Sequence, residues 1–233
     1  MDKQALKSVV LVGYGKMGRV LEETLPKEQF LITERVNSDQ ELHACVLQDK
    51  IAIDFSTPQA FLSHYRWLAD HCSGVLVGTT GWQGQHDEIV RYFIDNDTPM
   101  IYANNFSLGV NIYLQLVRCA SRWTSRLLEC DPYLLEMHHR SKLDRPSGTA
   151  VQLSEIIQQS YPEREFDVAS LRVAEVKGMH QVGFESAIER LVFTHEAFSR
   201  VGFAMGVWYA ARYLTELRGV MAFDELLAEI WQE

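Results

Sequence analysis

A dense polar segment at residues 136–149, EMHHRSKLDRPSGT, holds the side chains best suited to proton chemistry. It contains two histidines, three cationic side chains, two acids and three hydroxyls. Imidazole has a reference pKa of about 6.5, so a histidine can give or take a proton near neutral pH. A solvated loop would also be polar, but apolar runs on both sides predict a strand and a helix that anchor its ends. The segment is therefore a candidate for acid–base work on a bound molecule.

The end of this segment predicts a carboxylate site. Ser147 and Thr149 both suit the start of the helix expected at residues 150–159. Ser147 would act as a simple N-cap, whereas Thr149 would form a capping box with Gln152, and the sequence leaves both open. Free backbone amides at a helix start, with Lys142 and a histidine nearby, would bind an anion well.

A metal site is disfavoured in the same segment. His138 and His139 are adjacent, and neighbouring side chains on an extended strand point to opposite faces. The segment has neither an HExxH pattern nor a cysteine partner. The four cysteines of the chain are scattered without a CxxC pair, which predicts reduced thiols rather than zinc ligands or a redox pair.

A glycine-rich loop at residues 13–18, GYGKMG, fits the GxGxxG pattern. Alone the pattern is weak, but a strand-like run at 8–12 precedes it and a helical stretch at 16–25 follows. The first glycine makes the tight turn, the second lets the backbone approach a pyrophosphate, and the third lets the helix pack closely on the strand. The sequence thus predicts a Rossmann-type dinucleotide site.

Glu34 and Arg35 are candidates for the adenosine end of that site. Glu34 lies 21 residues after Gly13, at the expected end of a second strand, where an acid would accept hydrogen bonds from ribose hydroxyls. Arg35 would instead pair with the 2′-phosphate of NADP, so the cofactor is NADH or NADPH. A solvated strand end is the alternative. Two further loops, at 54–58 and 78–81, follow strand-like runs and either bind the ligand or only cap helices.

Strand-like and helical patterns alternate over the first hundred residues, with strands expected at 8–12, 30–36, 51–55, 74–78 and 100–103. Alternation of this kind predicts an α/β fold with a Rossmann-like parallel sheet. Only about thirteen residues, 37–49, join the second and third strands, which is near the minimum for a helical crossover, so we expect the sheet to be trimmed there.

The second part of the chain has a different pattern, typical of an α+β domain with a mixed sheet. Helices are expected at 108–127, 150–159, 202–217 and 223–231, and strands at 133–137, 170–176, 180–186 and 191–196. With hinges near residues 103–108 and 200, we expect a dinucleotide-binding domain at 1–106, joined by 201–233, and a substrate-binding and oligomerisation domain at 107–200.

Composition narrows the function classes. The chain has 233 residues, is 47% hydrophobic and 23% charged, and carries a formal net charge of −9. Binding to nucleic acid or to anionic membranes needs clustered Lys and Arg, so an acidic chain without long basic runs disfavours both functions. No apolar stretch approaches the roughly 18–20 residues of a membrane span, and the first residues lack a signal-peptide core, so a cytoplasmic protein is expected.

Several motifs together resemble the 4-hydroxy-tetrahydrodipicolinate reductase family. Residues 136–149 match that family's signature E-x-H-H-x-x-K-x-D-A-P-S-G-T at every fixed position except Arg145, where the signature has alanine. GYGKMG, IDFSTP, VGTTGW, ANNFSLGVN and ERLVFTHEAFSRVGFAMG follow in the family's order over nearly the whole chain. Ala174 and Lys177 depart from the glycine and proline that are usual there.

The resemblance implies a reductase of the diaminopimelate and lysine pathway that uses NADH or NADPH on a small dicarboxylate and assembles as a homotetramer. It implies that His138 and Lys142 handle protons, and that the substrate is bound by His139, Ser147, Gly148, Thr149 and Arg200. It also implies that the cofactor is bound by Gly13, Tyr14, Gly15, Lys16, Met17, Gly18, Glu34, Arg35, Gly78, Thr79, Thr80, Ala103, Asn104, Asn105 and Phe106.

Two alternatives account for part of the sequence. Another Rossmann reductase, such as an amino-acid dehydrogenase, explains the first half but not the segment HHRSKLDRPSGTA. A dinucleotide-sensing regulator explains the fold but has no need of both His138 and Lys142.

Overall fold

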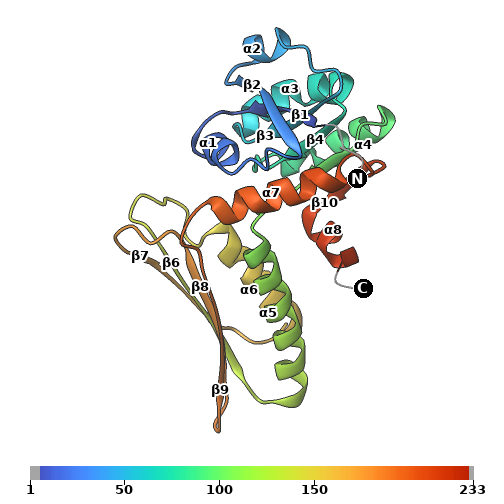
Figure 1. Ribbon diagram of the computed structural model, residues 1–233. Coiled ribbons are helices and arrows are strands. Elements are labelled where there is room, and N and C mark those ends of the chain that lie inside the picture. Colours follow the sequence, from blue (N-terminus) through green and yellow to red (C-terminus); the bar gives the residue numbers. More distant parts are fainter. Residues whose placement is uncertain (1–5, 231–233) are drawn as a thin grey trace. The chain divides into compact units, whose positions relative to one another are not determined.

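The computed structural model describes residues 6–230 and divides the chain into two compact units (Figure 1). Unit 1 comprises Met1–Phe106 and Phe203–Glu233, and unit 2 comprises Ser107–Gly202. In the described part, no helix is both long and apolar enough to cross a membrane.

Unit 1 is built on a six-stranded parallel sheet in the order β10-β5-β4-β3-β1-β2. The central strands are buried along almost their whole length, as expected where helices cover both faces of a parallel sheet. The strands are β1 (Lys7–Val12), β2 (Phe30–Val36), β3 (Lys50–Asp54), β4 (Gly74–Val77), β5 (Met100–Tyr102) and β10 (Val220–Ala222).

Side-chain caps begin helices α2 (Asp39–His43) and α3 (Pro58–His71) of unit 1. Helix α3 starts with Pro58 after Thr57, whose hydroxyl accepts a hydrogen bond from the amide of Ala60 at 3.3 Å. The remaining helices are α1 (Lys16–Glu23), the 3₁₀ turn η1 (Gln83–Gln85), α4 (His86–Asp95), α7 (Val201–Tyr213) and α8 (Phe223–Ile230).

Unit 1 departs from the sequence-based expectations in one helix end and one missed strand. The connection between β2 and β3 is short, as expected: it holds only the five-residue helix α2, capped by Ser38, and β2 forms an edge of the sheet. The helix expected at 202–217 ends at Tyr213, and β10, only three residues long, was missed. The last helix was expected to reach residue 231, which lies outside the described residues.

Unit 2 packs two helices, α5 (Leu108–Leu127) and α6 (Gly148–Ser160), on one face of a mixed sheet ordered β7-β6-β8-β9. Its strands are β6 (Asp131–His138), β7 (Asp167–Arg172), β8 (Met179–Glu185) and β9 (Arg190–Glu196). The β6–β7 pair is parallel and the other two pairs are antiparallel. The strand expected at 170–176 was wrong by several residues, because β7 ends at Arg172.

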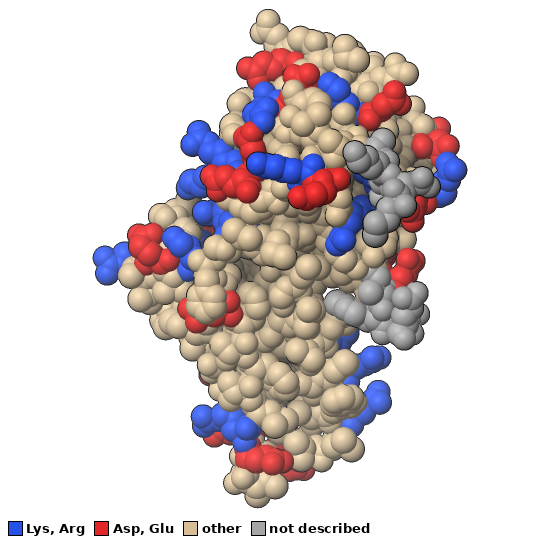
Figure 2. All heavy atoms as spheres, in the orientation of Figure 1, with Lys and Arg blue, Asp and Glu red and all other residues tan. Residues whose placement is uncertain are grey.

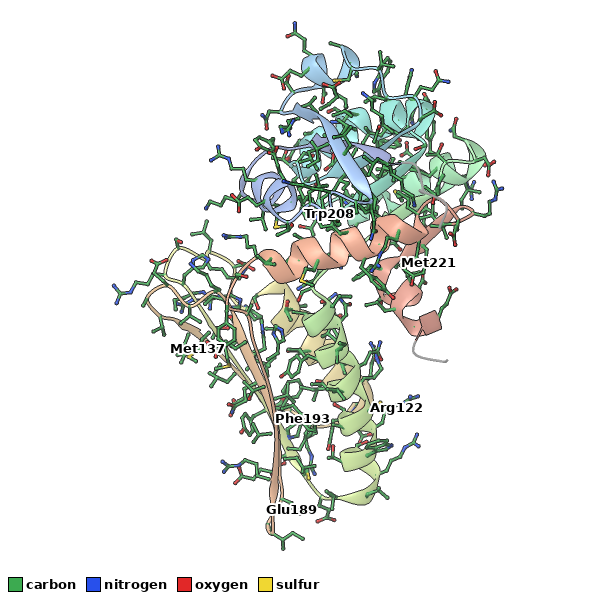
Figure 3. The ribbon with its side chains drawn as sticks, viewed as in Figure 1. Arg122, Met137, Glu189, Phe193, Trp208 and Met221 are labelled. Carbon is green, nitrogen blue, oxygen red and sulfur yellow. The ribbon has the colours of Figure 1, made fainter. Side chains whose placement is uncertain are left out.

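The two faces of this sheet differ. Leu134 on β6 and Val182 on β8 are buried with residues of α5 and α6 in one core. Side chains alternate along β6, so Met137 points to the opposite face, whereas Phe193 of β9 lies on the side of α5 (Figure 3). On the face shown in Figure 2, charged side chains of both signs gather over unit 1, and the body of unit 2 shows few.

Candidate active site

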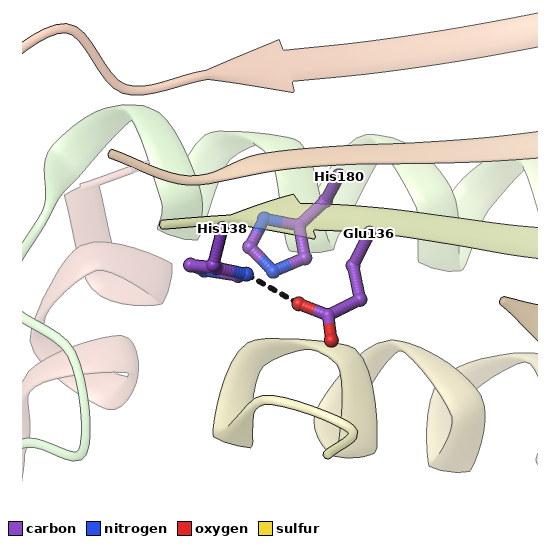
Figure 4. Close-up of side chains that lie close together, drawn as sticks. All are labelled: Glu136, His138 and His180. Atoms are coloured by element: carbon purple, nitrogen blue, oxygen red, sulfur yellow. Dashed lines mark ion pairs between the residues drawn. The ribbon is translucent and has the colours of Figure 1, made fainter. Parts of the chain in front are cut away.

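The alternation along β6 brings Glu136 and His138 to the helix-covered face of the unit 2 sheet. Antiparallel pairing sets His180 of β8 opposite Glu136, and parallel pairing sets Arg172 of β7 opposite His138. Figure 4 shows the two imidazoles and the carboxylate converging. We call Glu136, His138, Arg172 and His180 the β-sheet cluster.

Glu136 is the anion of the β-sheet cluster. Its side chain is fully buried, and its two oxygens form ion pairs with His138 Nδ1 and, at 2.9 Å, with Arg172 Nη1. Burial alone would raise the pKa of Glu136, but the hydrogen bonds from Ser170 and Arg172 outweigh it and hold that pKa below the ordinary value. The carboxylate is therefore ionised at neutral pH.

His138 is almost fully buried, and burial is the main reason why its pKa lies below the ordinary value. Glu136 raises that pKa and the Lys142 cation lowers it, with burial prevailing. The Nδ1 of His138 lies against the Glu136 carboxylate, which leaves Nε2 as the nitrogen that can exchange a proton with a ligand. Space at Nε2 is tight, because a Cβ added to Gly178 would lie 3.0 Å from it.

His180 extends the β-sheet cluster to the start of α6. Burial lowers its pKa to about 4, so the ring is neutral. Its Nε2 lies 3.0 Å from the hydroxyl of Ser147, and its ring meets the ring of His138 edge to face. Ser147 also accepts a hydrogen bond from the amide of Ala150 at 3.3 Å, so Ser147 is the N-cap of α6. Of the two alternatives for the start of α6, the simple N-cap at Ser147 is confirmed.

Glu136, His138 and His180 each offer a metal-ligand atom within 4.8 Å of the others. The sequence did not show this trio, because His180 comes from another strand. The Arg172 guanidinium already forms an ion pair with Glu136, and the charge of the Lys142 ammonium lowers the pKa of both histidines. Arg172 and Lys142 would repel a further cation at this position, so we interpret the trio as a proton-handling group.

The loop after His138 is tied to the β-sheet cluster by Arg172. Its Nε donates to the carbonyl of Lys142 at 3.2 Å, and its Nη2 donates to the carbonyl of Asp144. The ammonium of Lys142 lies 2.9 Å from the Asp144 carboxylate, and the Nδ1 of His139 lies 2.8 Å from the Ser141 hydroxyl. One buried guanidinium therefore fixes both Glu136 and the loop that carries Lys142.

The predicted substrate residues are brought together in part. Gly148 and Thr149 open the first turn of α6, next to Ser147 and hence to His180. Arg200 is exposed in the segment between β9 and α7, and in residues 6–230 no hydrogen bond or ion pair joins it to the β-sheet cluster.

The glycine loop of unit 1 has the geometry of a phosphate cradle. Gly13 has a φ of 83°, and a Cβ there would lie 2.5 Å from the carbonyl oxygen of Phe55, so only glycine fits. A Cβ on Gly18 would lie 3.1 Å from the Gly13 carbonyl, whereas around Gly15, directly before α1, nothing lies within 4 Å. The loop is closed toward the sheet and open at the start of α1, where a phosphate would bind.

The expected position of Glu34 at the strand end needs correction. β2 continues through Val36, and Asn37 follows, with its Oδ1 accepting a hydrogen bond from the amide of Tyr14 at 2.9 Å. Glu34 lies two residues inside the strand and pairs with Lys50 at 3.3 Å. β2 has the expected bounds 30–36, so Glu34 stands before the strand end and Asn37 takes the position directly after it.

Arg35 also has a partner of its own. Its Nε donates to Glu22 of α1 at 3.0 Å, its Nη2 pairs with the same oxygen, and the hydroxyl of Tyr14 donates to Glu22 as well. Arg35 would have to leave Glu22 to reach a ligand phosphate.

The other predicted cofactor residues lie at the carboxyl ends of β4 and β5. Gly78 follows β4, where a Cβ would collide with the ring of Phe55, and the hydroxyl of Thr79 donates to the buried Asp54. Thr80 and Asn104 are exposed, whereas Phe106 is buried against Phe223. These segments meet at one edge of the sheet, as parallel strands require.

Arg172 and His180 are the site residues that sequence reasoning missed, and it gave Glu136 no role. Glu136 could have been found, because it lies two positions from His138 and therefore on the same strand face. Arg172 and His180 carry no such local signal, since only the strand pairing brings them near His138.

Comparison with known proteins gives concordant matches. The family models described as "Dihydrodipicolinate reductase, N-terminus" and "Dihydrodipicolinate reductase, C-terminus" match residues 7–106 and 109–227. The 4-hydroxy-tetrahydrodipicolinate reductase of Christiangramia forsetii is 34% identical over 97% of this chain and 99% of its own length. The 4-hydroxy-tetrahydrodipicolinate reductase of Archaeoglobus fulgidus is 32% identical over 93% of this chain and 83% of its own length.

Among solved structures, dipicolinate-bound dihydrodipicolinate reductase from Paenisporosarcina sp. TG-14 superposes with a TM-score of 0.79. The match covers 94% of this chain and 98% of that one at 21% sequence identity, and it shows the same two-part fold.

Proposed function

Because this chain belongs to the dihydrodipicolinate reductase family, we propose that the β-sheet cluster and the start of α6 carry out the family's reaction. The protein is an NAD(P)H-dependent oxidoreductase that reduces 4-hydroxy-tetrahydrodipicolinate to tetrahydrodipicolinate, with loss of water, in lysine and diaminopimelate biosynthesis. The predicted α/β fold, with a Rossmann-like sheet and a mixed-sheet domain, is confirmed.

His138 is the proposed proton-transfer residue. The Glu136 carboxylate pairs with Nδ1 and holds the ring in place, and Nε2 is the nitrogen that we assign to proton exchange with the ligand. A dicarboxylate brings two negative charges, which raise the pKa of a buried imidazole and favour its protonated form. His138 can then hold a proton when the substrate is bound and release it to the substrate as negative charge develops.

Lys142 is the proposed second proton donor. Its side chain is three-quarters covered, and its ammonium lies 2.9 Å from the carboxylate of Asp144, in a loop that Arg172 anchors to the β-sheet cluster. An anchored ammonium near His138 can both attract a carboxylate and supply a proton.

The start of α6 is the proposed carboxylate site. Ser147 caps the helix, so the amides of Gly148 and Thr149 lie in its first turn, where partial positive charge gathers. His139 lies at the other end of the loop, and we keep it and the exposed Arg200 as further ligands of the dicarboxylate.

Unit 1 fits a dinucleotide. The cradle of Gly13, Gly15 and Gly18 at the start of α1 suits a pyrophosphate, and the segments 78–80 and 103–106 complete the sheet edge beside it. When bound, the nicotinamide supplies the hydride for the reduction. We therefore propose unit 1 as the cofactor domain and unit 2 as the substrate domain, close to the boundaries expected from the sequence.

Cofactor preference depends on the competition between Glu22 and a ligand phosphate for Arg35. If Arg35 binds a 2′-phosphate, Arg35→Ala should weaken NADPH binding much more than NADH binding, by about 1.5–3 kcal/mol. Glu22→Gln should then favour NADPH, because it removes the competing carboxylate. Fluorescence titration with both cofactors measures this, and equal losses for both in Arg35→Ala would show that Arg35 does not reach the phosphate.

The uncovered face of the unit 2 sheet is the proposed subunit interface of a homotetramer. It presents Met137 and the half-exposed apolar side chains Leu171 and Val192, at 44% and 46% exposure. An apolar sheet face of this kind is usually covered by a partner. Light scattering at micromolar concentration tests this, and a monomer would contradict it. A biosynthetic reductase works where its reduced cofactor is regenerated, so we also place the protein in the cytoplasm.

The observation that carries the proposed site is the pairing of His138 with a buried, ionised Glu136 next to the carboxylate-binding start of α6. Loss of absorbance of NADH or NADPH, with substrate generated in place by the preceding synthase, tests the activity. Turnover with a simple amino or hydroxy acid, and none with that substrate, would instead indicate an amino-acid dehydrogenase type.

A further inference from the structure

A second buried acid–histidine group lies in unit 1, in the domain proposed to bind the cofactor. His64 of α3 is 2% exposed and lies between two carboxylates. Its Nε2 is 2.7 Å from Asp54 Oδ2, at the end of β3, and its Nδ1 is 2.9 Å from Asp39 Oδ1, at the start of α2. The proposed reaction uses neither His64 nor these two acids.

The geometry determines the charge of His64. A neutral imidazole has one nitrogen without a hydrogen, and that nitrogen would face carboxylate lone pairs at hydrogen-bond distance. Both contacts are satisfied together when the ring carries two hydrogens and both acids are ionised. The arrangement therefore predicts an imidazolium between two carboxylates.

The surroundings of the two acids support their ionised forms. Asp54 Oδ1 accepts hydrogen bonds from the amide and hydroxyl of Ser56, at 3.0 and 2.8 Å, and from the hydroxyl of Thr79. Asp39 accepts a hydrogen bond from Ser63 at 2.7 Å, which is the main reason why the pKa of Asp39 lies below its ordinary value.

The charges of these two acids raise the pKa of His64, and the charge of His43 on α2 lowers the pKa of Asp39. Burial alone would lower the pKa of His64, but the hydrogen bonds and charges of Asp54 and Asp39 together raise it above the ordinary value.

The contacts of His64 join three crossovers of the sheet. Asp39 follows β2, Ser56 follows β3 and Thr79 follows β4, and all three lie at the carboxyl ends of their strands. The carbonyl of Thr79 in turn accepts a hydrogen bond from the indole of Trp82 at 2.7 Å. The three segments form the edge where a dinucleotide binds in this type of sheet.

We propose that His64, held as an imidazolium between Asp39 and Asp54, is a positioning residue that fixes the β3 and β4 loops against α2 for dinucleotide binding. This rests on the proposed placement of the cofactor in unit 1. Loss of one proton removes one of its two hydrogen bonds and releases α2 from the β3 and β4 loops. The bound dinucleotide needs those loops ordered, so the deprotonated protein binds it less tightly.

The first test is the dissociation constant of NADH and NADPH as a function of pH, measured by fluorescence titration without substrate. The constant should be flat while His64 is protonated and should then rise toward about tenfold per pH unit above the pKa of His64. Asp39→Asn removes one of the two carboxylates, lowers the pKa of His64 and should move this rise to lower pH. Asp95→Asn, which removes an exposed acid of α4, is the matched control and should leave the profile unchanged.

A second variant, His64→Gln, retains a donor for one carboxylate but cannot titrate. It should bind both cofactors several-fold more weakly, with no pH dependence in this range and with kcat at saturating cofactor retained. If His64 served only in folding, His64→Gln would lower the melting temperature. The pH profile of Asp39→Asn would then match that of the parent protein.

Nitrogen-detected NMR of histidine-labelled protein separates this proposal from the proposed function. Both ring nitrogens of His64 should carry hydrogen at pH 7 in the cofactor-free protein. A neutral ring at pH 7, or an Asp39→Asn profile identical to that of the parent, would overturn the proposal. Failure of the wild-type protein to turn over its substrate would instead count against the proposed function.

Discussion

His64 in unit 1 and His138 in unit 2 are both buried histidines beside a buried carboxylate, yet their pKa values shift in opposite directions. The pKa of His64 is raised, and that of His138 is lowered. Burial opposes the charged form in both, so burial cannot explain the difference. The neighbouring charges explain it: His64 has two carboxylates as direct partners, whereas His138 shares its one carboxylate, Glu136, with Arg172 and also lies near Lys142.

This contrast separates two uses of the same pair of residue types. An imidazolium whose two nitrogens are both bonded has no free nitrogen for a ligand, and so it serves as a fixed cross-link. A neutral imidazole with one nitrogen bonded retains the other for proton exchange. Counting charges around each ring thus distinguishes a structural histidine from a catalytic one, where burial alone does not.

The largest expected effect is that of His138→Ala on turnover. Removing the proposed proton-transfer group should lower kcat by roughly 10²–10⁴-fold, as for general acid–base groups elsewhere. Cofactor dissociation constants should stay nearly unchanged, which is the reverse of the effect expected for His64→Gln. Steady-state kinetics and fluorescence titration measure the two quantities, and near-full kcat at neutral pH would remove His138 from the mechanism.

Lys142→Ala in the same loop provides a comparison for His138→Ala. It removes a charge as well as a proton donor, so it should lower kcat and also raise KM for the dicarboxylate. A loss mainly in cofactor affinity would show that this loop belongs to the dinucleotide site.

Glu136→Gln tests whether the single carboxylate sets the protonation of His138. Glu136 raises the pKa of His138, so its removal should lower that pKa further and reduce the protonated fraction at neutral pH. We expect kcat at pH 7 to fall about tenfold for each unit of pKa lost, and the corresponding limb of the pH–rate profile to move to lower pH. Glutamine retains an acceptor for Arg172, and an unmoved limb would contradict the assignment.

Gly178→Ala tests whether Nε2 is the working nitrogen of His138. The added Cβ would lie 3.0 Å from Nε2, so the ring must move by a few tenths of an ångström, and the φ of 157° at Gly178 also strains an alanine there. A displacement of that size should lower kcat by about tenfold, with little change in cofactor affinity. Gly84→Ala is a suitable control, because nothing lies within 4 Å of a Cβ there. An unchanged kcat would indicate that the chemistry does not need Nε2 in its present place.

The smallest effect is expected at Ala174, in the segment between β7 and β8 that adjoins the β-sheet cluster. Ala174 has a φ of 39°, a left-handed conformation that costs a non-glycine residue about 1 kcal/mol. Ala174→Gly should therefore stabilise the protein by about 1 kcal/mol, or roughly 2–4 °C in melting temperature. Calorimetry measures this, and a lower melting temperature would show that the alanine methyl group contributes packing that outweighs the strain.

The sequence alone predicted the features whose signals are local. The glycine loop, the N-caps and the long helix α5 are defined by neighbouring residues, and α5 has the predicted bounds. The segment that carries His138, Lys142 and Ser147 was recognisable for the same reason, because its residue types are crowded into one stretch. The short strand β10 and the bounds of β7 were not predicted, because three residues, or a strand exposed along most of its length, give too weak a pattern.

Only the tertiary structure decided which charges surround each histidine. Arg172 and His180 reach His138 through the pairing of β6 with β7 and β8, and Asp39 reaches His64 across 25 positions of the chain. Asn37, rather than Glu34, follows the end of β2 and accepts a hydrogen bond from the amide of Tyr14, a contact that no count of residues reveals. A histidine's residue type and local motif are set by sequence, but its pKa depends on burial and on charges within a few ångströms, and those distances exist only once the strands and helices have paired.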